Sequence, residues 1–466
     1  MTATSAPLTP SGSPPRGVTQ PIGGELLRLA GPVFASQLLR IGYQWVDALW
    51  VKRLGVDATA AVTTSVFVMW AVYSLNDVFG LGVSAYVSQL LGAGERRRAG
   101  LAAYRGLSSS ALLGVVLMLA GLFTARRIYE LMNADAGVVE QGARYLSVVL
   151  SAAPLPMTAL TCETIMRASG DTRTPLVIDL FAVTLNAVLD PLLIYGGGPI
   201  RGMGVAGAAW ATVIAQTVMV LCYLTLAARR HRAFPFARRA EGPPIRIAAM
   251  ARVGIPGALI GVLFSAVYVA FARSAGSYGP AALAVVGVVN RIEALHFVNS
   301  VSLGMAGAAL VGQNLGAKRP DRAKDTIVTA NVWNFWISLV LSAAFLVAPQ
   351  VFLGLFSQDP GVHALGTPYL RVVALCLPFV GLEIVTAESI MGSGHTKAIS
   401  AIFTSFSLLR IPLAFLVPRW TGLGVVAIAW VITVSAALRS MLILAWASRG
   451  TWKGGLAAEL EGRGRG

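Results

Sequence analysis

Three aspartates and an asparagine lie inside long apolar stretches, where an ionisable group is costly and is therefore a functional candidate. Asp47 lies in one stretch, and Asp179, Asn186 and Asp190 share another. At 100° per residue, positions 179, 186 and 190 lie within about 20° of one line, so they form a polar face of a helix. Two buried carboxyl groups at close range cannot both ionise readily. Such a pair binds a proton, or a sodium ion with help from Asn186.

Other charged residues near this pair suggest an alternative. Arg40 precedes Asp47 by seven residues on the same helical face and is the partner that would make the aspartates part of a static ion pair. Asp77 and Asp179 are candidates for the same polar network. The two hypotheses differ in whether the carboxyl groups change their charge state.

A second set of ionisable residues in apolar stretches suggests gating or cavity roles. Glu163 and Glu388 each precede a Ser-Gly-x-Thr sequence and are candidates for gating or capping contacts near helix ends. Glu293 is a candidate for gating or for an acid of a substrate cavity. Glu383 has no evident partner, and His296 suggests a hydrogen-bonded structural role.

The stretches that hold these residues are long enough to cross a membrane. Of 466 residues, 56% are hydrophobic and 12% charged, and the mean hydropathy is +0.69. A helix needs about 20 apolar residues to cross a bilayer, and in lipid the backbone must satisfy its own hydrogen bonds. Windows without Asp, Glu, Lys or Arg cover residues 106–125, 202–228, 253–272, 294–317 and 326–358. The composition therefore predicts an all-α membrane protein.

The sequence predicts twelve transmembrane helices. They are expected at residues 26–51, 60–89, 104–125, 145–168, 174–196, 203–228, 251–274, 281–313, 325–348, 366–392, 398–418 and 423–447. They divide into an N-terminal lobe (23–231) and a C-terminal lobe (248–449), joined by a basic cytosolic loop (232–247). The polar ends, 1–22 and 450–466, are expected to be cytosolic tails, and the first of them to be disordered.

The basic residues that give the net charge of +16 are distributed unequally between the two sets of loops. Loops after even-numbered helices hold about 18 Lys and Arg, against about 9 in the other loops, which predicts that both termini are cytosolic. The loop at 229–252 alone carries seven arginines. This distribution predicts contact with the lipid bilayer and excludes nucleic acid as a partner.

An internal repeat at an offset of 224 residues relates the two lobes. Pro32 recurs as Pro256, and the sequence Gln-x-Leu-Gly-Ala occurs at both 89–93 and 313–317. Because each half contains six helices, both halves insert the same way up. They are expected to be related by a pseudo-twofold axis along the membrane normal, with a substrate path between them.

The repeat is broken at the carboxyl pair. Asp47 corresponds to Phe271 and Asp190 to Ile411, so the pair exists in the first lobe alone. Positions needed only for packing would be tolerated in both lobes. The asymmetry therefore favours a functional role for these aspartates.

Sequence motifs of enzymes are absent. There is no phosphate-binding loop, nucleophile elbow, His-Glu-x-x-His or paired Cys-x-x-Cys, and the three cysteines lie separately in apolar segments. The sequence predicts no enzyme activity, no cofactor and no metal site apart from a possible Na⁺ site at Asp47, Asn186 and Asp190. A monomer is expected.

Taken together, several short motifs resemble the multidrug and toxic compound extrusion (MATE) family over residues 23–448. They are Pro32 with Asp47, Asn186-x-x-x-Asp190-Pro191, Gly-x-Gly-Val-x-Gly-Ala-Ala at 202–209, Ser169–Thr172 and the two Gln-x-Leu-Gly-Ala sequences. The resemblance implies a secondary-active antiporter in a bacterial inner membrane. Such a protein exports amphipathic, often cationic, small organic compounds in exchange for H⁺ or Na⁺ by rocker-switch alternating access.

Within the family, the trio Asp47, Asn186 and Asp190 is similar to the DinF-like branch, in which ion binding there is linked to bending of the first helix. Thr212, early in the sixth helix, is the matching candidate for a threonine that joins the network. The seventh helix, 251–271, lacks the acid of the NorM-like branch. A lipid-linked saccharide flippase of the same superfamily is the alternative function, although it would favour a strongly cationic cavity.

Overall fold

The computed structural model describes residues 14–131, 135–197, 199–229, 234–456 and 460–461. Apart from one hairpin, its regular structure is helical. The first half contains α1 (Arg16–Thr19), α2 (Ile22–Val51), the 3₁₀ helix η1 (Lys52–Leu54), α3 (Val56–Gly92), α4 (Arg96–Leu131), α5 (Ala136–Ser151), α6 (Pro154–Ala168), α7 (Arg173–Tyr195) and α8 (Val205–Ala228). The strands β1 (Gly196–Gly197) and β2 (Ile200–Arg201) pair antiparallel between α7 and α8.

The second half repeats this order. It contains α9 (Ile247–Gly276), α10 (Pro280–Gly316), α11 (Pro320–Val347), α12 (Pro349–Gly354), α13 (Pro360–Ala374), α14 (Leu377–Met391), α15 (Lys397–Thr421), α16 (Val426–Ser448) and the 3₁₀ helix η2 (Thr451–Gly454). Among the described residues, nine single helices are long and apolar enough to cross a membrane, and two bent pairs pass the same test. With α2, a 30-residue helix, these elements match the twelve predicted spans.

The two bent spans occupy equivalent places in the repeat. The pair α5 and α6 is bent by 53°, and the pair α13 and α14 by 51°. Each second helix begins with a proline at its first or second position, Pro154 or Pro378. Proline has no N–H to donate to the preceding turn, so a continuous helix is interrupted there. Sequence hydropathy does not detect such a bend.

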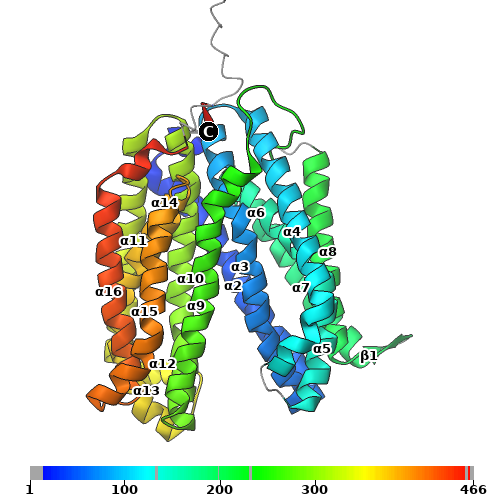
Figure 1. Cartoon of the computed structure of the whole chain (residues 1–466), viewed down its shortest axis with the longest axis vertical. Coiled ribbons are helices and arrows are strands. Elements are labelled where there is room, and N and C mark those ends of the chain that lie inside the picture. The colour runs from blue at the N-terminus through cyan, green and yellow to red at the C-terminus, as the bar shows by residue number, and fades with distance from the viewer. Residues whose placement is uncertain (1–13, 132–134, 198, 230–233, 457–459, 462–466) are drawn as a thin grey trace, which may run out of the picture.

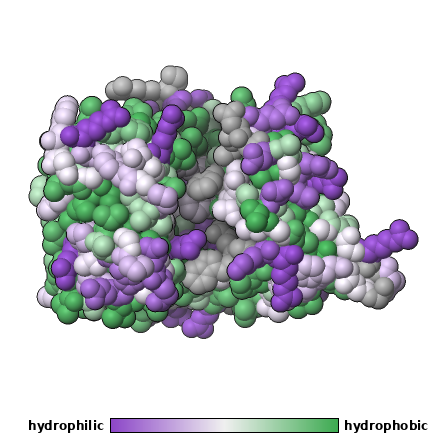
Figure 2. Space-filling model, turned by 90° about the horizontal axis from the view of Figure 1, so that it is seen from below, coloured by the Kyte–Doolittle hydropathy of each residue, from purple (hydrophilic) through white to green (hydrophobic). Residues whose placement is uncertain are grey.

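The helices form two lobes, α2 to α8 and α9 to α16, that lie side by side (Figure 1). They meet through α3, which contacts α9 and α10, and through α2, which contacts α10. The ribbons approach each other at the end near the chain termini, called the tail end here, and diverge toward the β-hairpin. Seen from that opposite end, the described residues of the two lobes lie on either side of a central strip (Figure 2).

The repeated Gln-x-Leu-Gly-Ala sequences form the contact between the lobes at the tail end. The Gln89 side chain donates to the Gly392 carbonyl at 3.0 Å, and the Gln313 side chain donates to the Ala168 carbonyl at 3.0 Å. Each glutamine thus bonds the fourth span of the other lobe. A Cβ added to Gly92 would lie 2.0 Å from the Gln313 carbonyl oxygen. Only glycine permits this approach of the two backbones.

Both chain ends pack on this contact. Asn314 donates to the Gly17 carbonyl at 3.1 Å, and the Leu456 N–H donates to the Gln89 side chain at 2.8 Å. The helical segment Arg16–Thr19, with Val18 buried, differs from the disorder predicted for residues 1–22. This short segment has no long apolar run from which its sequence could predict a helix. Tertiary contacts hold it in place. Residues 1–13, 457–459 and 462–466 of the predicted tails lie outside the described residues.

Trp452 is the main apolar anchor of the C-terminal segment and is 2% exposed. We expect Trp452→Ala to lower the free energy of unfolding by about 3 kcal/mol, because a large buried side chain is lost and a cavity remains. Trp420→Ala is the matched control, since Trp420 is 75% exposed, and should change stability by less than about 0.5 kcal/mol. Denaturant titration in detergent measures both. Equal effects would show that the C-terminal segment is not anchored through Trp452.

Candidate functional site

The structure brings the predicted carboxyl pair together in the N-terminal lobe. Asp47 on α2 is 7% exposed, and Asp190 on α7 is fully buried. Their carboxyl groups lie within hydrogen-bonding reach of each other. A hydrogen bond between two carboxyl groups requires that one of them carries the proton. Oδ1 of Asp190 is buried and has no hydrogen-bond partner among the described residues, so this oxygen remains available to a proton or a cation.

Asn186, fully buried, connects the two acids. Its amide is assigned with the nitrogen toward the carboxyl groups, because an oxygen placed there would face only acceptors. In this orientation the nitrogen donates to Oδ1 of Asp47 at 3.3 Å and to Oδ2 of Asp190 at 3.2 Å. The amide oxygen accepts from the Thr212 backbone N–H at 3.2 Å. Asn186 therefore acts as a donor to the acids.

Thr212 and a tyrosine missed by sequence reasoning complete the site. The Thr212 hydroxyl on α8 donates to the Ala208 carbonyl at 3.1 Å and lies 2.6 Å from the Tyr43 hydroxyl. Tyr43 also lies within hydrogen-bonding reach of Asp47. Tyr43 precedes Asp47 by four residues, one helical turn. That spacing was the available signal, but tyrosine is common in apolar helices and does not stand out.

Arg40 is not the partner of Asp47. It forms an ion pair with Glu163 on α6 and lies 3.7 Å from Asp179 on α7. Arg167 forms a second ion pair with Glu163. Asp179 thus belongs to this ion-pair cluster rather than to the carboxyl pair, although it shares the polar face of α7. The alternative in which Arg40 neutralises Asp47 is wrong, because the guanidinium is already matched by two acids.

Two further predicted acids lie where the lobes face each other. Asp77 on α3 and Glu388 on α14 are within range of each other's charge and of Arg167. Neither makes an ion pair with a described residue. No described contact joins Asp77 to the Asp47 network, in which it had been expected. Glu388 packs beside Gly304, where an added Cβ would lie 2.5 Å from its Cβ. Glu388 therefore packs against α10, and its gating role stays a prediction.

In the C-terminal lobe, Glu383 has a partner that sequence reasoning missed. Nε of Arg439 on α16 donates to Oε2 of Glu383 at 2.7 Å, and Nη2 donates to Oε1. The two side chains are 8% and 1% exposed. The signal was Arg439 itself, an arginine inside an apolar helix that needs a partner. His296 is hydrogen-bonded as expected, with Nε2 2.7 Å from the Ser338 hydroxyl.

We expect Arg439→Met to lower the free energy of unfolding by about 3–5 kcal/mol, because it leaves the Glu383 carboxylate buried without a partner. The double variant Glu383→Met/Arg439→Met should recover most of that loss. Arg144→Met, at the exposed Arg144–Glu140 pair, is the control and should cost less than about 1 kcal/mol. Unfolding in detergent measures all three. A double variant no more stable than Arg439→Met would contradict this account.

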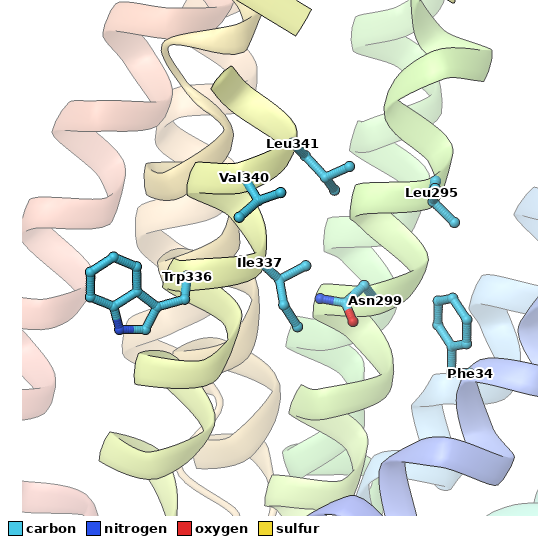
Figure 3. A pocket seen from close by; sticks show the side chains of 7 residues that line it. All are labelled: Phe34, Leu295, Asn299, Trp336, Ile337, Val340 and Leu341. Carbon is cyan, nitrogen blue, oxygen red and sulfur yellow. The ribbon is translucent and has the colours of Figure 1, made fainter. Parts of the chain in front are cut away.

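A pocket of about 430 Å³ lies between the lobes. Phe34 lines it from α2, Leu295 and Asn299 from α10, and Ile337 and Val340 from α11, with Trp336 and Leu341 beside them (Figure 3). Asn299 is its one polar side chain, and its amide donates to Asn334 at 2.8 Å. The pocket therefore offers an apolar surface made by both lobes.

The comparisons with known proteins agree with this arrangement. The family model MatE matches residues 32–192 and again 256–416. The two matched stretches begin 224 residues apart, which is the offset of the internal repeat. Each match covers the equivalent helices of one lobe. The repeat is thus a duplicated family unit.

Relatives and solved structures cover nearly the whole chain. The chain is 26% identical to a probable multidrug resistance protein, YoeA, of Bacillus subtilis, over 91% of this chain and 92% of the relative. It is 26% identical to a protein of Shewanella oneidensis described as an FAD transporter, over 86% and 89%. A structure described as the outward-facing conformation of a multidrug resistance MATE family transporter superposes with a TM-score of 0.86 at 22% identity, covering 95% of this chain and 99% of that one.

Proposed function

The chain belongs to the MatE family of multidrug efflux transporters, multi-pass inner-membrane proteins that are not enzymes, and from this premise we propose that it is a proton-driven antiporter. Its substrates in this proposal are small amphipathic organic compounds, and the bound proton resides on the Asp47–Asp190 pair. The geometry of that pair carries the proposal. Two buried carboxyl groups within hydrogen-bonding reach hold one proton between them and can exchange it.

Asn186 supports a proton on the carboxyl pair through its hydrogen bonds. In the assigned orientation its amide nitrogen faces both carboxyl groups, and its oxygen accepts from the Thr212 N–H. A donor at this position satisfies the carboxylate that has lost its proton. The sequence alone left both ions open.

The direction of transport follows from the placement of charge. The three arginines that begin α4, Arg96 to Arg98, and the described ends of the chain lie at the tail end, so we place that end in the cytosol. The lobes contact each other there and diverge at the other end. This arrangement corresponds to an outward-facing state. Rocking of the lobes about the α3, α9 and α10 contact would open the cytosolic end instead.

Proton binding is coupled to transport through α2 in this proposal. Pro32 interrupts the hydrogen-bond ladder of α2, and Asp47 lies fifteen residues farther along the same helix. When the carboxyl pair is neutral, α2 and α7 can approach closely. When the pair is charged, repulsion and hydration favour a different packing of α2. Pro32 is the position at which such a change can be absorbed.

The decisive experiment imposes ion gradients on liposomes that contain the purified protein. A proton gradient that runs from the external face of the protein to its cytosolic face should drive export of ethidium. A sodium gradient of equal size in the same direction, at uniform pH, should not. Export driven by sodium alone would overturn proton coupling while leaving the family assignment intact. Absence of gradient-driven movement of any small organic compound would overturn the antiporter proposal.

The flippase alternative receives little support from the charges. Arg40 is neutralised by Glu163 and Asp179, and Arg439 by Glu383. Transfer of a lipid-linked pyrophosphate would need several unpaired cations in the central space. The same liposomes can be loaded with a lipid-linked saccharide. Transfer of that lipid without export of ethidium would favour the alternative.

A further inference from the structure

The chain continues past the C-terminal lobe into a short segment that crosses to the other lobe. The 3₁₀ helix η2 follows α16 and is flanked by Gly450 and Gly455, both in a left-handed backbone conformation with φ values of 69° and 53°. Residues that carry a Cβ rarely adopt this conformation, so glycine at these positions lets the chain turn at either end of η2. Residues 450–456, called the strap here, thereby run from the end of α16 to Gln89 on α3.

The first half of the strap is anchored in the C-terminal lobe. Trp452 belongs to an apolar cluster whose other buried members lie on α10, α11, α14 and α15. Its indole N–H donates to the Ala447 carbonyl on α16 at 2.9 Å. Nζ of Lys453 lies 3.5 Å from a carboxylate oxygen of Asp321 on α11. These contacts remain within one lobe, so the first half of the strap moves with that lobe when the lobes rock.

The second half of the strap is bound to the N-terminal lobe. Leu456 is buried and belongs to an apolar cluster in which most residues come from α3, α4 and α6. Its N–H donates to the Gln89 side chain at 2.8 Å, and a Cβ added to Gly455 would lie 2.6 Å from Oε1 of Gln89. Farther along the chain, the Leu460 carbonyl accepts from Nη2 of Arg98 on α4 at 2.9 Å. The strap therefore connects the two lobes.

Gln89 joins the strap to the contact between the lobes. Its amide nitrogen donates to the Gly392 carbonyl of the C-terminal lobe, while its amide oxygen accepts from Leu456. Leu456 also lies against Gly394, where an added Cβ would lie 2.7 Å from Cδ2 of the leucine. The leucine side chain thus fills a space that both lobes enclose. When the lobes part at the tail end, Leu456 must become exposed to water.

The N-terminal segment crosses between the lobes in the opposite direction. The helix α1 precedes the N-terminal lobe, but its carbonyl groups at Gly17 and Val18 accept from Asn314 and Arg319 of the C-terminal lobe, each at 3.1 Å. The last carbonyls of a helix have no partner within the helix, so side chains of another element can satisfy them. Each chain end is thus bound to the lobe to which it does not belong.

From this arrangement we infer that the strap favours the closed state, in which the lobes meet at the tail end, and must leave the N-terminal lobe before that end opens. The inference rests on the rocking of the lobes in the proposed function and adds a step that limits access from the cytosol. Leu456 is buried between the lobes in the closed state alone, whereas Trp452 stays buried in its own lobe. A smaller side chain at position 456 therefore destabilises the closed state selectively and shifts the population toward the open state.

The test measures how fast maleimide labels a thiol at position 88 of the full-length protein in nanodiscs. Ser88 is fully buried where α3 meets α10, and Ser88→Cys is made in protein whose three native cysteines are serine. The labelling rate follows the population of the open state when opening and closing are fast. Leu456→Ala should raise this rate at least about tenfold. Lys453→Gln, also in the strap, should leave it unchanged, because Lys453 pairs within its own lobe.

Leu146→Ala separates release of the strap from general loss of stability. Leu146 is fully buried in an apolar cluster whose members all lie in the N-terminal lobe. The change should lower the thermal midpoint at least as much as Leu456→Ala does, without faster labelling. An unchanged rate in Leu456→Ala overturns the inference, as does an equal rise in Leu146→Ala. Absence of ethidium export would instead overturn the proposed function, since the labelling rates are measured without substrate or ion gradient.

Discussion

Asp190→Asn protein should fail to accumulate substrate against a gradient. For one-for-one exchange of H⁺ with a monovalent cation, a gradient of two pH units supplies about 2.7 kcal/mol and sustains a substrate ratio of about 100 across the membrane. Asparagine cannot release a proton, so the pH gradient no longer does work on the substrate. The ratio should fall to about 1, a loss of about two orders of magnitude. Asp47→Asn should have the same effect.

Ethidium distribution in liposomes measures this ratio directly. Glu140→Gln is the matched control, because Glu140 is an acid of the same lobe that lies exposed in a pair with Arg144. It should keep the wild-type ratio. The thermal midpoint of each variant separates loss of coupling from loss of fold. Since asparagine resembles the protonated acid, Asp190→Asn is expected to fold. A folded Asp190→Asn protein that sustains a hundredfold ratio would exclude Asp190 from coupling.

The helices and the duplication could be predicted because both leave local signals. Every predicted span has a helix or a bent pair at its place, and the offset of 224 residues recurs in the family match. The neighbourhood of Asp47 and Asp190 could also be predicted. A polar side chain in an apolar helix must face another polar group, and the two helices run in the same direction.

The partners of Arg40 and Arg439 could not be predicted, because their acids lie on other helices. Arg40 was matched to Asp47 by the face of its own helix, whereas its acids lie on α6 and α7. The rotation of α2 against those helices decides the pairing, and it depends on side-chain packing across the lobe. The Glu383–Arg439 pair joins residues 56 positions apart in the chain. Neither of these ion pairs leaves a periodic signal in the sequence.

The contact between the lobes at the tail end, called the seal here, depends on glycines, which have no side chain. Filling the space at one of them gives the second large expected effect. A Cβ added to Gly316 would lie 1.9 Å from the Gln89 carbonyl oxygen, so Gly316→Ala forces the lobes apart. Overpacking of this kind costs about 1–3 kcal/mol. We expect the population with a sealed tail end to fall about 5- to 150-fold relative to the state with the tail end open, and gradient-driven export to fall accordingly.

Gly287→Ala is the matched control, since Gly287 lies on the same helix with open space around it. That change should leave the seal intact and stabilise α10 slightly, because alanine loses less backbone entropy than glycine. A cysteine at position 88, introduced into protein in which Cys162, Cys222 and Cys376 are serine, reports the seal, because Ser88 is fully buried where the lobes meet. Maleimide should label it in Gly316→Ala and not in Gly287→Ala. Because Gly92 makes the same close approach from the other lobe, Gly92→Ala should expose the same cysteine. Equal labelling in all three variants would show that the close backbone contact does not hold the lobes together.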